Sequence, residues 1–440
     1  MKKAIKTLIA LFFFSISLLA LSFSISAKTA YSVECDNADS AEAIYLYSYD
    51  SKSVLYSKNE KKLLSPASTV KIMTGLIACE RLGNRLDEQI TVSEEVLEGH
   101  TGVSMGLKLG ASYSVRDLLY GAICGGCNDA SQALAILCSD SIDEFVMDMN
   151  EYATRLDMSS TIFKNPTGLD ANGAQTTIFD IAILSKAAAK NNLYMQISSA
   201  KNYTYKNADG QDTVIYNRNA LISHFTATQY LNDNANGLIA GSTENGGYVV
   251  STLARVNGMS YLCIVMGADR GGNEIYSYKI ANELIANAAS KFGYVKIRTK
   301  NEKVSTLPVD CVLTTNKETN ISCVLEDDVY AYIPKNIDLK KRIEYRVYFH
   351  NKDLVAPINE GDVLGGLNIY LDGKLIGSAR IISGSSVEEN SFLIFMRDMK
   401  SFLASRYFLI FILVATPSLA IFLYFDYMKR RRKNVRYIKF

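Results

Sequence analysis

The sequence contains few residues that could form a metal site. It has only three histidines, His100, His224 and His350, and none of them lies near its single Cys-x-x-Cys pair, Cys124 and Cys127. No second Cys-x-x-Cys follows to complete the four ligands of a structural zinc site. The sequence therefore predicts neither a metal ion nor another cofactor.

Internal repeats and low-complexity segments are also absent, which leaves 440 residues for two or three globular domains. Tryptophan is missing and only six prolines occur, but neither feature indicates a function. Nearly half of the residues are apolar, so the chain can form a sizeable core.

The main body of the chain has no excess of positive charge. The formal net charge of +2 arises from basic residues near the two ends, within residues 2–6 and 429–439. Without these residues and Asp426, 37 basic residues remain against 44 acidic ones, a net charge near −7. This balance argues against nucleic acid as a partner.

The N-terminal end predicts export. Residues 1–27 combine Lys2, Lys3 and Lys6 with an apolar run that ends in small residues, which is typical of a cleaved secretory signal peptide. An uncleaved N-terminal anchor is the alternative.

The C-terminal end predicts a membrane anchor. Residues 407–425 carry no charge and are long enough to cross a bilayer as a helix. The basic run 429–433 follows, so residues 426–440 are expected to form a cytoplasmic tail. The two ends together predict a single-pass protein of the cell membrane whose main body is extracytoplasmic.

The stretch "CGGCND", Cys124 to Asp129, allows a redox interpretation. A redox dithiol would need an exposed thiol of low pKa in a thioredoxin-like unit, and no βαβ pattern precedes this stretch. Disulfides are permitted in an exported chain. Cys311 and Cys323 would then face each other across a hairpin, or remain free and buried.

Hydrophobic periodicity indicates strands and helices in the first two thirds of the chain. A hairpin is expected over residues 41–57, with its turn at 50–52. A helix should begin at Ser65, which can cap it, with Pro66 in the first helical position. Two strands joined by a turn at Asn257-Gly258 are expected within 236–268. Further helices are predicted near residues 115–124, 128–139, 141–156, 178–191 and 274–291.

The pattern changes after this part of the chain. Residues 295–385 are strand-like throughout and predict a separate all-β domain. "RIEYRVYF" places alternate side chains on one face, and "LNIYLDGKLIG" predicts a hairpin around Asp372-Gly373. The alternating side chains are Ile343, Tyr345, Val347 and Phe349.

"SPASTVKIMT" contains a Ser-x-x-Lys pattern, Ser68 and Lys71. Residues three apart on a helix share one face, so a lysine with a suppressed charge could take the serine proton. Ser68 would lie in the first helical turn, where free backbone N–H groups can stabilise an oxyanion. The pattern alone is weak, because "SSAK", Ser198 to Lys201, matches it too.

The sequence around this pattern resembles the D-alanyl-D-alanine carboxypeptidases, the low-molecular-weight penicillin-binding proteins. "YSYDSKSVLYSKNEKKLLSPASTVKIMT", "GAICGGCNDASQALA", "MSSTIFKNPTGLD", "TTIFDIAILSKAAAKN" and "YNRNALI" match successive stretches of that family. "NGLIAGSTENGGYVVSTLARVNGMSYLCIVMGA" and "VAPINEGDVLGGLNIYLDGKLIG" continue the match in order. The resemblance covers residues 40–385.

The resemblance implies an α/β (α+β) fold like that of serine β-lactamases and transpeptidases, with an antiparallel sheet flanked by helices. It implies a catalytic domain, a small β-rich domain, a linker and a transmembrane helix. These parts are expected at residues 31–292, 293–385, 386–406 and 407–425.

The resemblance also implies the chemistry. Ser68 would be acylated by the penultimate D-alanine of a peptidoglycan stem peptide, with release of the terminal D-alanine, and water would then free the shortened peptide. Lys71 would be the general base, and the N–H groups of Ser68 and Ser242 would form the oxyanion hole. A β-lactam would be a further ligand.

The second family motif, Ser-x-Asn, departs from the pattern. It falls on Gly126, Cys127 and Asn128. Asn128 can still bind the peptide group of a substrate, but Gly126 removes the serine that relays a proton to the leaving amine. The neighbouring Cys127 should point elsewhere, about 100° around the helix.

The third family motif, Lys-Thr-Gly, departs further. It falls on Ile239, Ala240 and Gly241, so that only the glycine is retained and the positive charge near the substrate carboxylate is lost. Three nearby residues could compensate: Ser242, Thr243 and Arg255.

Two classes of function therefore remain open. One is a working serine D,D-carboxypeptidase, favoured by Ser68 and Lys71. The other is a degenerate family member that binds wall peptides or regulates partners at the membrane, favoured by Gly126, Ile239 and Ala240. A β-lactamase fits less well, because the β domain and the anchor suit wall-peptide processing better.

Overall fold

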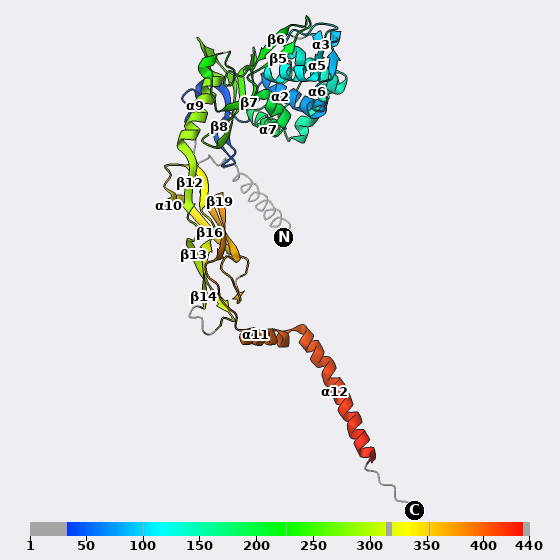
Figure 1. Cartoon of the computed structure of the whole chain (residues 1–440), viewed down its shortest axis with the longest axis vertical. Helices are drawn as coiled ribbons and strands as arrows, with labels where there is room; N and C mark the ends of the chain where they lie inside the picture. Colours follow the sequence, from blue (N-terminus) through cyan, green and yellow to red (C-terminus); the bar gives the residue numbers. More distant parts are fainter. Residues whose placement is uncertain (1–32, 100, 226, 314–318, 352, 434–440) are drawn as a thin grey trace, which may run out of the picture. The chain divides into compact units, whose positions relative to one another are not determined.

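The computed structural model describes residues 33–99, 101–225, 227–313, 319–351 and 353–433 (Figure 1). The predicted signal peptide, His100 and the end of the predicted tail lie outside these residues. The chain divides into two compact units. The first extends to Tyr294 and includes Tyr332–Ile337, and the second comprises Val295–Ala331 and the residues from Asp338 onward.

An antiparallel five-stranded sheet forms the centre of the first unit, in the order β2-β1-β9-β8-β7. The hairpin expected over 41–57 is confirmed, and so is the turn at Asn257-Gly258, where both residues have positive φ. The strands are β1 (Ala41–Ser48), β2 (Ser53–Lys58), β7 (Ala235–Thr243), β8 (Gly247–Val256) and β9 (Met259–Ala268).

Helices cover both faces of this sheet, as predicted. In Figure 1, α9 lies on one side of β7 and β8, while α2, α5 and α6 lie on the other. The helices of the unit are α2 (Val70–Leu82), α3 (Glu94–Leu97), α4 (Val115–Leu119), α5 (Asn128–Ser139), α6 (Ile142–Arg155), α7 (Ile178–Ala188), α8 (Asn192–Ser198) and α9 (Tyr276–Lys291).

Short elements complete the first unit. The helix predicted near 115–124 is α4 followed by one π-helical turn, η3 (Tyr120–Cys124). The remaining pieces are η1 (Ala38–Ser40), η2 (Ala67–Thr69), η4 (Thr228–Tyr230), β3 (Gln89–Thr91), β4 (Ser112–Ser114), β5 (Asn202–Lys206), β6 (Asp212–Tyr216), β10 (Arg270–Gly271) and β11 (Glu274–Ile275).

The helix that carries Ser68 begins later than the sequence predicts. Ser65 does not cap it, because its hydroxyl donates to Asp170 (3.2 Å) instead. The 3-10 turn η2 comes first, with Ala67 in the left-handed region at φ +45°, and α2 starts at Val70. Left-handed backbone is strained for a residue with a Cβ. Proline and serine preferences describe only local chemistry, whereas contacts with a distant loop determine this helix start.

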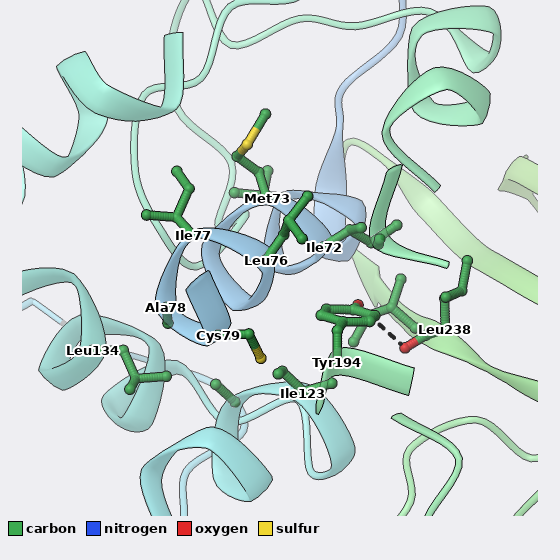
Figure 2. Close-up of a cluster of buried hydrophobic side chains, with 14 of the residues drawn as sticks. Ile72, Met73, Leu76, Ile77, Ala78, Cys79, Ile123, Leu134, Tyr194 and Leu238 are labelled. Carbon is green, nitrogen blue, oxygen red and sulfur yellow. Dashed lines mark hydrogen bonds between the residues drawn. The ribbon is translucent and has the colours of Figure 1, made fainter. Parts of the chain in front are cut away.

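Helix α2 is the centre of the main hydrophobic core. Figure 2 shows its apolar side chains among residues from α5, α8, η3 and β7. Almost all of α2 is buried, which is the pattern of a core helix rather than a surface helix. Tyr194 packs beside it and its hydroxyl donates to the carbonyl of Leu238 (3.5 Å). This packing holds the first turns of α2 against the sheet.

The second unit is built mainly of strands, as predicted. Its six-stranded sheet has the order β16-β18-β19-β14-β13-β17 around a separate apolar core. The hairpin at Asp372-Gly373 is confirmed, with positive φ at both residues. The strands are β13 (Lys303–Asp310), β14 (Asn320–Leu325), β16 (Ile343–Phe349), β17 (Leu354–Val355), β18 (Val363–Leu371) and β19 (Lys374–Ser383). The chain also contains β12 (Phe292–Arg298), paired with β15 (Val329–Pro334), and the short helix α10 (Leu339–Arg342).

Alternation along β16 follows the prediction at three of four positions. Ile343, Tyr345 and Phe349 pack against the core, whereas Val347 is 41% exposed.

The disulfide proposed across a hairpin does not form. Cys311 and Cys323 are both free, and Cys323 lies opposite Ser305 in the β13–β14 pair. Cys311 follows the end of β13, so the strand register keeps the two sulfurs from facing each other. The alternative of free thiols holds, with Cys323 buried and Cys311 half-buried.

Two helices follow the β sheet in sequence. The segment expected to be a linker contains α11 (Ser391–Ala404), whose apolar side chains are mostly exposed. Next comes α12 (Arg406–Lys433). Within the described part of the chain, α12 is the one helix that is long and apolar enough to cross a membrane.

Candidate active site

Ser68 opens into a pocket of about 290 Å³ in the first unit. The pocket lies between η2, the start of α5 and the edge strand β7. Seven of the eight residues predicted for the site line it: Ser68, Lys71, Gly126, Asn128, Ala240, Gly241 and Ser242. Residues separated by more than 170 positions in the sequence are thus brought together, and only Ile239 stays outside.

Gly241 lies directly against the serine. A Cβ added at Gly241 would come within 2.2 Å of Ser68 Oγ and 2.7 Å of Ser68 Cβ. No real side chain tolerates such contacts, so strand β7 can pass this close to Ser68 only with glycine at position 241. The glycine of the third motif is therefore required by the nucleophile, in addition to any approach of substrate.

Ser68 is half-buried and sits in the 3-10 turn before α2. Among the described residues its backbone N–H has no hydrogen-bond partner. Unpaired N–H groups at a helix start are available for an anion. Ser242, on the edge strand across the pocket, is exposed.

Lys71 is one helical turn beyond Ser68 and only 4% exposed. Its Nζ donates to the backbone carbonyl of Thr167. The pKa of Lys71 is lowered to about 8, mainly by burial; Cys127 opposes this shift and the positive charge of Arg218 adds to it. Near pH 8 a large fraction of this lysine is neutral, so it can accept a proton.

Asn128 is the first residue of α5 and is 5% exposed. Its Nδ2 donates to the carbonyl of Thr101 (2.5 Å), and its Oδ1 lacks a hydrogen-bond partner within the described residues. One N–H of this amide is engaged by the backbone, and the buried oxygen is left without a partner among the described residues. Asn128 thus lines the pocket with an amide whose hydrogen-bonding capacity is only partly used.

Gly126 has φ +66°, in the left-handed region. A Cβ at this position would meet only ordinary contacts, 3.6 and 3.7 Å from carbons of Arg218. A Cβ therefore fits at this position, whereas the left-handed backbone disfavours any residue that carries one.

The two cysteines of "CGGCND" do not form a reactive dithiol. Cys124 and Cys127 are free and buried, and burial raises the pKa of each thiol to about 12. Both remain protonated at neutral pH, the opposite of a redox site. Cys127 precedes α5 and lines a neighbouring cavity rather than the Ser68 pocket, so it points elsewhere as expected. The described residues contain no group of three or more potential metal ligands.

At the third motif, two apolar side chains occupy the positions where the family pattern has a lysine and a threonine. Ile239 is buried in the same core as α2, and Ala240 belongs to the core on the opposite face of the sheet. Of the residues considered for compensation, Ser242 and Thr243 line the pocket but carry no charge. Arg255 is exposed, pairs with Ser260 on β9 and does not line the pocket, so that expectation is wrong.

Sequence reasoning missed several residues that line the pocket, and two of them act on Lys71. Arg218 lines it and shifts the pKa of Lys71, and the carbonyl of Thr167 holds the lysine. Both lie in stretches that carry the family resemblance, "YNRNALI" and "NPTGLD". Arg218 could have been selected from the sequence, because it is a cation in one of the stretches that match the family.

A buried lysine one turn from a serine, beneath the edge of an antiparallel sheet, defines a protein of the serine acyl-transfer class. Residues 29–270 match the family model described as "D-alanyl-D-alanine carboxypeptidase", and residues 292–389 match "Penicillin-binding protein 5, C-terminal domain". Since the first match covers more than half of the chain, the protein belongs to the D-alanyl-D-alanine carboxypeptidase family.

Individual relatives agree with this assignment. The chain is 27% identical to D-alanyl-D-alanine carboxypeptidase DacF of Bacillus subtilis, over 90% of this chain and 97% of the relative. It is 29% identical to DacD of Escherichia coli, over 79% and 86%. Among solved structures, penicillin-binding protein 5 of Haemophilus influenzae aligns with a TM-score of 0.55 at 26% identity, covering 80% of this chain and 98% of that one. The predicted fold class is confirmed.

Proposed function

We propose that this protein is a serine D,D-carboxypeptidase that removes the terminal D-alanine from peptidoglycan stem peptides. The observation that carries the proposal is the pair of Ser68 and Lys71. The serine is accessible in a pocket, and the lysine beside it has a pKa of about 8. A base of this pKa is neutral often enough to activate a serine near neutral pH.

The reaction begins when neutral Lys71 takes the hydroxyl proton of Ser68 and Ser68 Oγ attacks the carbonyl carbon of the penultimate D-alanine. The unpaired N–H of Ser68 and the N–H of Ser242 stabilise the negative oxygen of the tetrahedral intermediate. The C–N bond then breaks, and the leaving amine of the terminal D-alanine takes a proton from protonated Lys71. An acyl ester on Ser68 remains.

Deacylation repeats these steps with water as the nucleophile. Lys71 takes a proton from the water, and the ester bond to Ser68 Oγ breaks with return of that proton to the serine. No serine at position 126 is needed in this scheme, because the same lysine serves both the nucleophile and the leaving group. Arg218 contributes a positive charge to the pocket, whereas Ile239 is apolar and contributes none.

The arrangement of the chain fits work at the cell wall. We assign residues 31–292 to the catalytic domain, 293–385 to the small β domain, 386–406 to a connecting segment and 407–425 to a membrane span. The family matches and the length of α12 support this division. Residues 1–27 would be a signal peptide, and the tail from 426 would lie in the cytoplasm.

The test uses the full-length chain in detergent with a labelled penicillin and with a pentapeptide that ends in D-Ala-D-Ala. We expect a covalent adduct on Ser68, and release of D-alanine that Ser68→Ala abolishes. A folded protein that gives neither adduct nor D-alanine would overturn the proposal and favour a wall-peptide-binding or regulatory role. Release that persists in Ser68→Ala would disprove the nucleophile.

A further inference from the structure

Strand β16 forms one edge of the six-stranded sheet in the second unit. It pairs with β18 on one side and stands at the end of the strand order among the described strands. The opposite edge is formed by β17, which has only two residues. Edge strands are normally short or interrupted by proline, a bulge or several charges, because a free edge can pair with another chain. β16 has seven residues, no proline and no bulge in its pairing with β18, so it lacks most of these protections.

The free backbone groups of β16 belong to alternate residues. At the end of the strand, the N–H of His350 donates to the carbonyl of Leu364, on the side of β18 (3.0 Å). Hydrogen-bonding groups alternate between the two sides of an antiparallel strand, so the even-numbered residues of β16 direct theirs toward β18. The N–H and C=O groups of the odd-numbered residues, among them Tyr345 and Val347, therefore point away from the sheet, where a further strand can bond to them.

One apolar side chain on this edge is left uncovered. Val347 lies on the same face of β16 as Ile343 and Tyr345, which pack against the core of the second unit. Val347 is nevertheless 41% exposed, because no strand lies beside it on the open side of β16 among the described residues. An added strand would cover this side chain.

The charged residues of β16 are Glu344 and Arg346, on the other face of the strand. They form an ion pair with each other, with 2.7 Å between Arg346 Nε and Glu344 Oε1, and both side chains are more than half exposed. The guanidinium of Arg346 also lies over the ring of Tyr370 on β18, 4.3 Å from the ring centre. An added strand would therefore meet one charge of each sign, two residues apart.

This charge pattern favours one register for an antiparallel pair of two copies of β16. Registers that keep the apolar faces together differ by two residues, which moves the two-fold axis by one residue. An axis at Tyr345 places Glu344 of each copy opposite Arg346 of the other, and Val347 opposite Ile343. An axis at Glu344 or at Arg346 would instead place like charges directly opposite each other, which destabilises a strand pair.

We propose that β16 is a homodimer interface, in which two copies of the chain pair antiparallel about a two-fold axis at Tyr345. The pairing joins two six-stranded sheets into one and bonds the free backbone groups of both edges. Two ion pairs between Glu344 and Arg346 of different copies form on one face, and Val347 is covered on the other. The interface involves no residue of the Ser68 pocket, so it is independent of the proposed function.

The test measures the mass of the full-length protein in detergent by sedimentation equilibrium over a range of concentrations. Wild type should show a reversible equilibrium between monomer and dimer. Glu344→Arg and Arg346→Glu should each raise the dissociation constant about tenfold, because each turns two attractive charge pairs of the dimer into repulsive ones. The double variant Glu344→Arg with Arg346→Glu restores the opposite charges and should return the dissociation constant to near the wild-type value.

Arg380→Glu is the matched control. Arg380 is also exposed and ion-paired, to Glu326 (2.8 Å), but it lies on β19, away from the edge. Its replacement should leave the dissociation constant unchanged. Thermal unfolding should give nearly the same Tm for all four variants, because exposed ion pairs contribute little to stability.

Three results would contradict the proposal. One is a wild-type protein that stays monomeric up to about 100 µM, since a dimer weaker than this falls outside the range expected for a specific interface. Another is a dimer that both single variants retain, because it would then form elsewhere, for example through α12. The third is a double variant that stays as monomeric as the single variants, which would rule out the register at Tyr345.

Discussion

The two walls of the Ser68 pocket differ in how far they keep the family pattern. The wall formed by η2 and α2 retains the serine, and its lysine is buried and has a lowered pKa. By the predicted placement of the motifs, the wall formed by β7 and the approach to α5 lacks the serine, lysine and threonine of the family pattern and keeps Gly241 and Asn128. Of the two residues that remain, Gly241 is required by its close approach to Ser68, and the predicted departures concern proton relay and charge.

Close packing and positive charge in this pocket come from different residues. Gly241 cannot change while Ser68 stays where it is, because any Cβ would collide with the hydroxyl. Position 239 carries no cation, because Ile239 is apolar and buried in the core around α2. Arg218, from the segment before β7, lines the same pocket and acts on Lys71.

The largest expected effect is on the retained wall. Lys71→Met should slow acylation of Ser68 by penicillin at least about 100-fold, because general-base catalysis is worth about 10²–10⁴-fold. The measurement is adduct formation over time, followed by intact mass. Thermal unfolding serves as the control, since removing a buried ammonium should leave Tm equal or higher. Acylation within twofold of wild type would show that another group is the base.

Gly241→Ala tests the geometric requirement of the second wall. The new Cβ would displace Ser68 Oγ, and a shift of about 1 Å at a reacting atom can cost about 100-fold in rate. Gly377→Ala is the matched control, because a Cβ there meets nothing closer than 3.6 Å. If both variants acylate at the wild-type rate, the contact between β7 and Ser68 is looser than the structure indicates.

Restoring the lost cation tests the charge requirement. The double variant Ile239→Lys with Ala240→Thr should raise the acylation rate about 10- to 100-fold, as expected for a charge-assisted hydrogen bond worth about 1.5–3 kcal/mol. It should also lower Tm, because Ile239 is buried in the core of α2. Ile239→Met separates the loss of packing from the gain of charge.

A folded double variant with an unchanged rate would mean that Arg218 already supplies what the family lysine would supply. The second wall would then lack the lysine of the family pattern, but the positive charge that this lysine supplies would be fully replaced.

The smallest effect is expected for Arg218→Gln, and it is a shift in pH dependence. Lys71 must be neutral to act as a base, so the acylation rate should rise with pH through about 8. Without the positive charge of Arg218, the protonated form of Lys71 is less disfavoured, so its pKa should rise and the inflection should move to higher pH. One pKa unit would slow the reaction about tenfold at pH 7. Arg255→Gln, exposed and outside the pocket, should leave the profile unchanged.

Much of the fold could be predicted from local patterns. The helix predicted at 128–139 is α5 (Asn128–Ser139), and the turns at Asn257-Gly258 and Asp372-Gly373 form as expected, because residues that accept positive φ mark them. The start of α2 was predicted wrongly. The residue that decides it is Asp170, which engages Ser65 from over a hundred positions away, and no local pattern could show this.

The site residues also divide into those that the sequence showed and those that only the folded structure showed. The family resemblance was enough to select Ser68, Lys71, Asn128 and Gly241, all of which line one pocket. It did not select Thr167 or Arg218, because their roles depend on which groups lie beside Lys71 after the loops have packed.

The sequence by itself determined the family, the order of the elements and the residues present at each motif, because these follow from local periodicity and motif order. Only the tertiary structure decided the electrostatics of the site. Burial of Lys71 beside Arg218 sets its pKa, and burial of Cys124 and Cys127 keeps their thiols protonated. The physical reason is that desolvation and charge interactions depend on distances in space, and residues far apart in the sequence come together only when the chain has folded.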